Sequence, residues 1–374
     1  MPDADELIQS PIAARTVADG AEVENIYGMA QPIVVSDPLE EYKAVREGVG
    51  LLDFSPLMKV DVEGPGAKQK LNRLHSRNLE KVATGRIAYG TILNEEGGIV
   101  DDSTVMVRGD DKLRMAGSPL MPPQVIPFAE AEGLTAVERR DELAHLNIQG
   151  PRSRDLLAAL TDADVANEAF PYYTFKDSIA VAGIDDVFIT RMGFTAELGY
   201  ELFVAADRAL DLYDALIAEG GQYGIKPVGV AAIMMIRLEA GMVMGEFEYD
   251  ESTSPWEASL GWTVDLDKGD FRGREAVAKL RDERRGRIVS VILESGEDAA
   301  TGAPLKTADG TEIGAVTMAM PSPHLGGKTL GLARVDKDKM APGTPVVATV
   351  GGEEITGELA AVPVYDPERK RVKS

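Results

Sequence analysis

The pattern of apolar residues changes near residue 284, and this change constrains the fold more than any other feature of the chain. Before it, helix-like and strand-like segments alternate. After it, short β-rich runs follow one another, separated by turn signals such as Asp309-Gly310 and Gly351-Gly352. Short strands at such close spacing predict a small, separate β-barrel. The runs cover residues 288–293, 313–318, 330–335 and 346–350.

The first 283 residues mix helical and strand patterns, which predicts an α+β fold. Residues 1–38 hold turn formers and few periodic segments, so we expect an irregular N-terminal arm. A chain of 374 residues is too long for one ordinary core and predicts two or three domains. We place two interleaved α+β domains at residues 39–150 and 151–283, and a C-terminal barrel domain at residues 284–374.

Periodicity places individual elements within this plan. Apolar residues at helical spacing predict amphipathic helices, and strict alternation of apolar and polar residues predicts a half-buried strand. We interpret Met234, Met235, Met242 and Met244 as residues that fill the core. The helices are expected at residues 39–50, after Gly150, at 210–220 and at 229–240, and strands at 58–63 and 186–191.

The composition excludes several classes of site. The chain has no cysteine, which excludes disulfides, thiolate metal sites and cysteine nucleophiles. Its three histidines, His75, His145 and His324, are scattered, so we expect no metal site. A net charge of −23 argues against nucleic acid as a partner, because phosphates would be repelled. No apolar run could span a bilayer and residues 1–6 lack a signal-peptide pattern, so we expect a cytoplasmic protein without a membrane partner.

Asp101 and Asp102 follow a glycine-containing turn at residues 94–98 and begin a predicted strand. Adjacent side chains of a strand point to opposite faces, so if Asp102 faces solvent, Asp101 faces inward. A buried carboxylate needs a partner or a ligand, which makes Asp101 a candidate functional residue. On these residues alone, a pair of carboxylates that caps the turn is the favoured interpretation.

The run GFTAELGYE at residues 193–201 is typical of a loop that enters a strand. Its two glutamates, Glu197 and Glu201, are candidates for an inward carboxylate. Such a group can accept two parallel hydrogen bonds from a flat ring that bears an amine and a ring N–H. Tyr172 and Tyr173 could stack on this ring, although ordinary core packing explains such aromatic residues equally well.

The chain lacks the motifs of common catalytic nucleophiles and nucleotide-binding loops. It contains no G-x-S-x-G elbow, no Walker loop and no G-x-G-x-x-G run. With neither a metal site nor a protein nucleophile in the sequence, a bound cofactor would have to supply the reactive atom.

Several short segments, in order, resemble the folate-dependent aminomethyltransferase family, which contains the T-protein of the glycine cleavage system and related tetrahydrofolate-dependent demethylases. The resemblance extends from about residue 28 to residue 366. The most distinctive segments are LNEEGGIVDD at 93–102, GFTAELGYE at 193–201 and RLEAGM at 237–242. Others lie at residues 44–55, 148–151, 261–264, 270–276, 322–323 and 332–335.

The resemblance implies a three-domain cloverleaf of α+β domains, a C-terminal β-barrel and a central channel for tetrahydrofolate. It implies that Glu201 holds the pterin amine and ring N–H, and that Asp101 lies near the reactive folate nitrogens as the catalytic residue. Physically, such an enzyme supplies position and electrostatics, because a folate nitrogen is the nucleophile. The predicted cofactor-binding residues are Glu201, Tyr89, Tyr172, Tyr173, Phe194 and Glu197.

Two departures from the family pattern bear on the substrate. T-proteins carry Ala-Arg-Asp before RLEAGM, and this chain has Ala232-Ile233-Met234 there. Ile233 thus replaces an arginine that helps to bind substrate, so we expect a donor pocket with less preference for anionic groups. If Ile233 faces a core instead, Arg237 is the candidate to take over the role. In addition, Gly117 stands where the family carries an asparagine in the channel.

These features support three functional hypotheses. The first is a tetrahydrofolate-dependent transferase or demethylase that acts on a small methyl or aminomethyl donor and yields methyl- or methylene-tetrahydrofolate. The second is an authentic T-protein, which would also need a lipoyl carrier protein as its partner. The third is a non-catalytic folate-binding protein like the relatives that assist iron–sulfur assembly; those relatives rely on a cysteine motif that this chain lacks.

Overall fold

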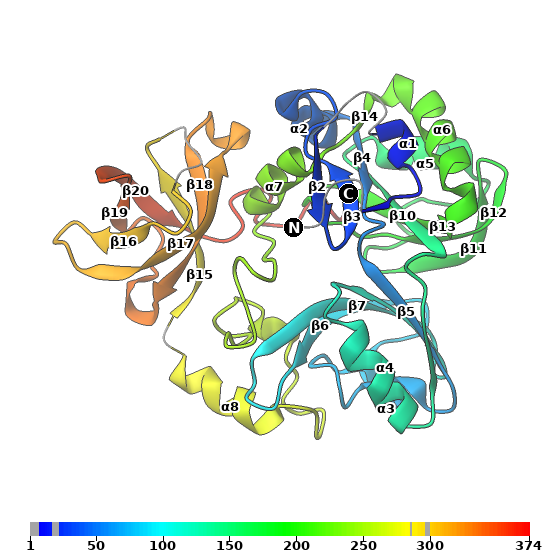
Figure 1. Cartoon of the computed structure of the whole chain (residues 1–374), viewed down its shortest axis with the longest axis horizontal. Coiled ribbons are helices and arrows are strands. Elements are labelled where there is room, and N and C mark those ends of the chain that lie inside the picture. The colour runs from blue at the N-terminus through cyan, green and yellow to red at the C-terminus, as the bar shows by residue number, and fades with distance from the viewer. Residues whose placement is uncertain (1–6, 17–21, 285, 296–299) are drawn as a thin grey trace.

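The computed structural model describes residues 7–16, 22–284, 286–295 and 300–374. Residues 1–6, whose sequence pattern was considered above, lie outside the described residues. Three lobes surround a common centre: a barrel, a five-stranded sheet and a six-stranded sheet (Figure 1). The predicted α+β fold with a C-terminal barrel is confirmed. Among the described residues, no helix is long and apolar enough to cross a bilayer.

The six-stranded sheet has the order β11-β12-β13-β10-β4-β14 and is antiparallel except for the β4–β14 pair. Its core is formed by strand residues such as Leu146 and Ile148 against helix residues such as Leu156 and Leu212. The strands are β4 (Val49–Asp53), β10 (Leu143–Gln149), β11 (Phe175–Val181), β12 (Ile184–Thr190), β13 (Gly199–Ala205) and β14 (Ile225–Pro227). The associated helices are α2 (Pro38–Glu47), α5 (Ser153–Leu160), α6 (Ala209–Gly220) and α7 (Val230–Glu239).

The five-stranded sheet is antiparallel throughout, in the order β6-β7-β8-β5-β9. The strand expected at residues 58–63 is present as β5, but it is not half-buried. Lys59 and Asp61 are buried as well as the apolar residues, because β5 lies between two other strands and Asp61 binds Arg114 in a two-point ion pair of 2.7 and 2.8 Å. The elements are β5 (Met58–Glu63), α3 (Ala67–Leu71), β6 (Ile87–Leu93), β7 (Ile99–Gly109), β8 (Lys112–Gly117), α4 (Pro122–Ala131) and β9 (Thr135–Glu138).

The C-terminal barrel closes in the order β15-β18-β17-β16-β19-β20 and has its own apolar core. All four predicted β-rich runs lie in its strands, and sequence patterns missed only the short β16 and the polar β20. Helix α8 (Arg274–Glu283) leads into it. The strands are β15 (Gly286–Leu293), β16 (Pro304–Thr307), β17 (Glu312–Pro321), β18 (Thr329–Asp336), β19 (Pro345–Val350) and β20 (Glu353–Ala360).

The described part of the N-terminal arm is more regular than expected. It forms a three-stranded sheet from β1 (Ile8–Gln9), β2 (Val23–Ile26) and β3 (Met29–Pro32), with the short helix α1 (Ala13–Thr16). Ile12, Met29 and Ala30 are buried against the rest of the molecule. Turn formers concealed this sheet because its strands have two to four residues, too short for a period to show.

The segment that follows β20 returns from the barrel to the six-stranded sheet, and its end lies in the middle of the molecule (Figure 1). The backbone N–H of Tyr365 donates to the Glu239 carbonyl at 3.0 Å. Further along, the Arg371 guanidinium lies 3.1 Å from the buried Glu197 carboxylate. This segment therefore brings residues from the end of the chain to the centre of the three lobes.

Candidate active site

A cavity of about 960 Å³ lies where the lobes meet. Its lining includes Gln31 of the arm, Asp101 of the five-stranded sheet, Glu201 of the six-stranded sheet, Val289 of the barrel and Arg369 of the C-terminal segment. The volume falls within the range of roughly 300–1,000 Å³ that is typical of small-molecule sites. Every lobe thus contributes to the lining of one cavity.

Asp101, on β7, is almost fully buried, with 2% of its surface exposed. Its Oδ2 accepts a hydrogen bond from the Ser118 N–H at 3.1 Å. Gly117 makes room for the carboxylate, because a Cβ atom there would lie 2.7 Å from the same oxygen. Burial, followed by the neighbouring Asp102 charge, raises the pKa of Asp101 to about 8. The group is therefore protonated at neutral pH in the free protein.

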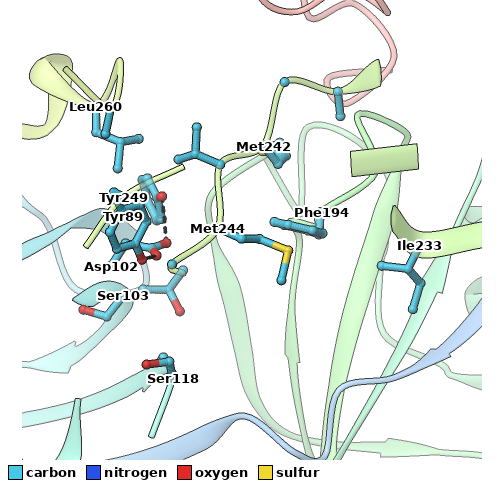
Figure 2. Close-up of a pocket in the computed structure, with 18 of the residues that line it drawn as sticks. Tyr89, Asp102, Ser103, Ser118, Phe194, Ile233, Met242, Met244, Tyr249 and Leu260 are labelled. Atoms are coloured by element: carbon cyan, nitrogen blue, oxygen red, sulfur yellow. Dashed lines mark hydrogen bonds between the residues drawn. The ribbon is translucent and has the colours of Figure 1, made fainter. Parts of the chain in front are cut away.

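Asp102 faces the cavity, so the condition under which Asp101 alone would point inward is not met. It lines the same cavity, and its carboxylate accepts hydrogen bonds from the Tyr89 hydroxyl at 2.8 Å and from the Tyr249 hydroxyl (Figure 2). Burial raises the pKa of Asp102, and the two hydroxyl donors oppose that rise. Side chains do alternate along β7, but the cavity reaches both faces at this end of the sheet, so neither carboxylate is a simple turn cap.

Glu201, on β13, lies in another part of the cavity lining with 6% of its surface exposed. Its Oε2 accepts a hydrogen bond from the Thr190 hydroxyl at 2.9 Å and lies 3.5 Å from Nε2 of His145. Burial lowers the pKa of His145, which keeps the ring neutral at neutral pH. No described residue donates a hydrogen bond to Oε1 of Glu201. One carboxylate oxygen is thus available for a ligand.

The predicted aromatic residues also line the cavity. Tyr172 and Tyr173 meet edge to face, with ring centroids 4.7 Å apart, and burial raises the pKa of both hydroxyls. Phe194 packs edge-on against Phe54 at 6.3 Å. These rings form a rigid apolar surface of the kind that stacks on a planar ligand.

An apolar wall completes the cavity. Ile233 and Met234 on α7, and Met242 and Met244 after it, belong to the lining. In the view of Figure 2, Met244 and Phe194 lie between the Asp102 cluster and Ile233. The interpretation of the methionines as core residues is correct for Met235, which is buried. Met242 packs against a buried cluster and also lines the cavity, and Met234 and Met244 line the cavity. Amphipathic periodicity could not separate a core face from a cavity face, since both are apolar.

Two predicted site residues lie outside the cavity lining within the described part of the chain. The Glu197 carboxylate, 2% exposed, is held by Arg46 at 3.3 Å, by Arg371 at 3.1 Å and by a tyrosine hydroxyl. Arg237 is fully buried and forms an ion pair with Glu248 at 2.6 Å. Both residues serve the packing of the lobes, so we leave them out of the proposed site.

Sequence patterns missed several residues of the cavity. Tyr249 gave no signal, because it follows α7 in an irregular loop and belongs to no motif. Tyr27 lies in the arm; burial and the two aspartates raise its pKa to about 12. His145 had been considered only as a metal ligand, and among the described residues no cluster suited to a metal ion is present. Its place beside Glu201 follows from the pairing of β10 with β13.

Comparisons with known proteins account for this architecture. The family model of the GCVT N-terminal domain matches residues 12–268, and that of the glycine cleavage T-protein C-terminal barrel domain matches residues 286–366. The chain belongs to the glycine cleavage T-protein family. The family predicted from the sequence is therefore confirmed, and with it the expectation of an enzyme.

Full-length relatives of this T-protein family member include aminomethyltransferases. That of Streptomyces coelicolor is 34% identical over 97% of this chain and 99% of its own length, and that of Halothermothrix orenii is 32% identical over 92% and 96%. A trimethylamine-oxide aldolase of Ruegeria pomeroyi is also 32% identical over 94% of this chain, which covers 46% of that longer protein. The crystal structure of glycine cleavage system aminomethyltransferase T from Bartonella henselae shares the fold, with a TM-score of 0.85 over 96% of this chain and 98% of that one, at 24% identity.

Proposed function

We propose that this protein transfers a one-carbon unit from a small methylated donor to tetrahydrofolate. The observation that carries the proposal is the pair of buried carboxyl groups in one largely apolar cavity. Glu201 has an oxygen free to accept hydrogen bonds, and Asp101 has a pKa of about 8 and holds a proton. The Glu201 oxygen can accept hydrogen bonds from an uncharged ring with N–H donors. The Asp101 carboxyl can give its proton to a heteroatom that leaves the donor.

The residues of the cavity fit a pterin ring. Glu201 would accept hydrogen bonds from the pterin amine and ring N–H, where its charge makes these bonds stronger than neutral ones. Tyr172, Tyr173 and Phe194 would pack against the ring faces or edges. A pterin bound there would use the carboxylate oxygen of Glu201 that no described residue occupies. Tetrahydrofolate supplies a nucleophilic nitrogen that accepts the carbon.

Asp101 then acts as a general acid in this proposal. As the donor's carbon bonds to the folate nitrogen, its bond to the heteroatom would break. The heteroatom would keep the electron pair and take the Asp101 proton, and the proton lost from the folate nitrogen would restore Asp101. A transferred methyl group would give methyl-tetrahydrofolate, and an aminomethyl group would give methylene-tetrahydrofolate with release of its nitrogen as ammonia, so neither reaction needs an oxidant. The apolar wall excludes water from the reacting atoms, which strengthens the electrostatic effect of both carboxyl groups.

The apolar wall also supports the choice of donor. Ile233 and Met234 offer no charge to an anionic substrate, and Arg237 is already engaged by Glu248. A methoxy-aromatic or N-methyl compound suits such a wall better than an anionic group does. The relative named trimethylamine-oxide aldolase indicates that this family includes a protein named for a methylated amine.

The second candidate is the aminomethyltransferase reaction of glycine cleavage, with a lipoyl carrier protein as partner. The names of the full-length relatives favour it, since they match this chain from end to end. Asp101 would serve that reaction equally well by protonating the amine nitrogen, which then departs as ammonia.

The test is a tetrahydrofolate-dependent assay in which methylated donors are compared with the aminomethylated lipoyl carrier protein. We expect methyl-tetrahydrofolate to form from an O- or N-methylated compound, and little product from the carrier protein. Robust formation of methylene-tetrahydrofolate from the carrier would overturn the donor class and favour the second candidate. If tetrahydrofolate binds tightly but no donor is turned over, the result would favour a non-catalytic folate-binding protein.

A further inference from the structure

Asp101 and Asp102 line the cavity side by side, and among the described residues neither forms an ion pair with a lysine or arginine. Buried carboxylates elsewhere in the chain do have such a partner; Glu248, for example, is paired with Arg237 at 2.6 Å. Two tyrosine hydroxyls donate to the Asp102 carboxylate, which favours its charged form. A buried charge is stable only with a partner, so this part of the cavity lacks a cation.

The two arginines of the cavity lining do not supply that cation. The charge of Arg369 acts on the hydroxyls of Tyr172 and Tyr173, the rings assigned to the pterin. Arg287 is an exposed residue of the barrel strand β15. A metal ion is not indicated either, because the described residues hold no cluster of three carboxylate or histidine ligands. The missing cation is therefore expected to be an organic one.

Aromatic rings surround the two aspartates. Tyr89 and Tyr249 both donate to Asp102 and lie beside it in Figure 2. The Tyr89 ring is held in place by Trp262, with centroids 5.7 Å apart and planes 26° apart. We name Tyr27, Tyr89 and Tyr249, which all line the cavity, the tyrosine cluster. The negative faces of such rings attract ammonium ions, and methylated ammonium ions are the ligands that they bind best.

Tyr27 reaches the cavity from an unfavourable backbone conformation. It lies in the two-residue turn between β2 and β3, with a φ of 53°, a value that disfavours a bulky side chain. The Arg140 guanidinium fixes the turn by donating to the Tyr27 carbonyl at 2.6 Å. Burial and the charges of Asp101 and Asp102 keep the hydroxyl neutral, and no described side chain forms a hydrogen bond with it. Residues in such conformations concentrate at ligand sites.

Ser103 adds a polar group without a partner to the same part of the lining. It is 2% exposed, and it shares one face of β7 with Asp101. Its hydroxyl has no hydrogen-bond partner among the described residues, although a buried hydroxyl normally has one. A ligand with a polar substituent would supply that partner.

We propose that this part of the cavity binds a methylated ammonium ion as the methyl donor, with Asp102 as its counterion and the tyrosine cluster around its methyl groups. The inference rests on the function proposed above and narrows its donor class to a cation. With the pterin at Glu201 and the reacting nitrogen near Asp101, Asp102 is the carboxylate left for the donor. The hydroxyl of Ser103 would meet a polar substituent of the ammonium ion.

A positive charge on the donor nitrogen also makes the transfer easier, because the nitrogen departs as a neutral amine. As the methyl carbon bonds to the folate nitrogen, its bond to the ammonium nitrogen breaks and the electron pair stays on that nitrogen. The amine takes the Asp101 proton, and the proton lost from the folate nitrogen restores Asp101. The products are methyl-tetrahydrofolate and a protonated amine with one methyl group fewer, so no oxidant is needed.

The first test compares two ligands of the same shape by calorimetry. Choline carries a trimethylammonium group, and 3,3-dimethylbutan-1-ol has a carbon atom in place of the nitrogen. Both carry a hydroxyl, so the comparison isolates the charge. We expect the wild-type protein to bind choline about tenfold more tightly than the alcohol.

Variants assign this preference to residues. Asp102→Asn should abolish it, and Tyr27→Leu should weaken choline binding by about threefold or more without changing the affinity for the alcohol to the same extent. The control Tyr223→Leu, which removes a half-buried tyrosine outside the cavity lining, should keep the wild-type preference. Thermal melts would confirm that each variant is folded. A preference for choline that survives in both Asp102→Asn and Tyr27→Leu would show that the ammonium ion binds elsewhere.

The second test is the tetrahydrofolate-dependent assay with trimethylammonium and methoxy-aromatic compounds as donors. We expect methyl-tetrahydrofolate from a trimethylammonium compound, with a larger KM in Tyr27→Leu than in Tyr223→Leu. If tetrahydrofolate does not bind at all, the proposed function fails. If it binds but choline and the alcohol have equal affinities, or if only methoxy-aromatic donors are turned over, the ammonium site is overturned while the proposed function stands.

Discussion

Asp101 and Asp102 are adjacent residues of β7, but their carboxyl groups have different surroundings. Asp102 is held by two tyrosine hydroxyls, which stabilise its charged form. Asp101 receives one backbone N–H and lies beside that charge, so its proton is retained. Burial raises the pKa of both carboxyl groups, and two tyrosine hydroxyls oppose the rise at Asp102, so the two identical side chains differ in how readily they hold a proton.

The first prediction concerns the proton on Asp101. Because burial raises its pKa to about 8, the protonated form dominates below that pH and is lost above it. We expect kcat/KM to fall as pH rises through about 8. Asp101→Asn should remove this limb and lower kcat by roughly 10²–10⁴-fold, the range typical of a general acid. Steady-state kinetics across pH would measure both effects, and a variant with the wild-type kcat and profile would show that Asp101 is not catalytic.

The second prediction concerns Glu201. Glu201→Gln keeps the shape of the side chain and an oxygen for Thr190, but it removes the charge that the pterin donors would meet. We expect tetrahydrofolate affinity to fall by about 2–3 kcal/mol, the effect of losing a charged hydrogen-bond partner. Calorimetry measures this directly. Glu246→Gln, which changes an exposed carboxylate of the same cavity, is the control and should bind nearly as well as the wild type. Equal affinities for both variants would remove Glu201 from the cofactor site.

At the scale of elements, the pairing of β7 with β8 sets the position of the Asp101 carboxyl. Gly117 ends β8 opposite Ser103, and its missing side chain is the space that Asp101 uses. We expect Gly117→Ala to displace the carboxylate from its Ser118 hydrogen bond and lower kcat at least tenfold, with a small change in stability. Gly109→Ala is the matched control at the far end of β7, where a Cβ atom meets nothing within 4 Å. Steady-state kinetics and thermal melts of both variants would measure kcat and stability. A wild-type kcat in Gly117→Ala would contradict the prediction that Asp101 needs the space at Gly117.

Long helices and strands with a clear apolar periodicity could be predicted from the sequence, but the residues that form the cavity walls could not. Helix α7 and four of the six barrel strands follow from apolar spacing, and Asp101 and Glu201 follow from family motifs. Met244 and Ile233 are apolar like core residues, so only the tertiary structure shows that they border a cavity. Glu197 has the same side chain as Glu201 and lies in the same run, yet it forms ion pairs with Arg46 and Arg371. Partners this distant in sequence leave no local signal.

At the scale of the whole molecule, a buried charge network joins the lobes. The Arg46 guanidinium lies 2.7 Å from Glu239 and 3.3 Å from Glu197. Glu239 also accepts the hydroxyl of Ser322, next to the barrel strand β17, at 2.6 Å. These groups connect α2, α7, the barrel and the C-terminal segment. This network adds to the apolar clusters that also join the lobes, such as the cluster of Leu93, Leu238 and Leu332.

The fourth prediction tests that network. Arg46→Met leaves the buried Glu239 carboxylate without its cation and Glu197 with Arg371 alone, so we expect a loss of roughly 3–5 kcal/mol in stability. Arg15→Met is the control, because its pair with Asp214 at 2.8 Å is half exposed and should contribute at most about 1 kcal/mol. Denaturant titration of both variants would measure the difference. Equal losses would indicate that the network does not couple the lobes.

The order of the strands also bears on how the chain emerges during synthesis. All five strands of one sheet come from the contiguous stretch between residues 58 and 138, so this lobe can be completed as soon as that stretch has left the ribosome. Strand β4 is made earlier, yet its partners β10 and β14 arrive only at residues 143–149 and 225–227. The five-stranded lobe is thus inserted in the sequence of the six-stranded lobe. During synthesis, β4 of the six-stranded lobe therefore stays unpaired, with its apolar residues uncovered, while the five-stranded lobe folds.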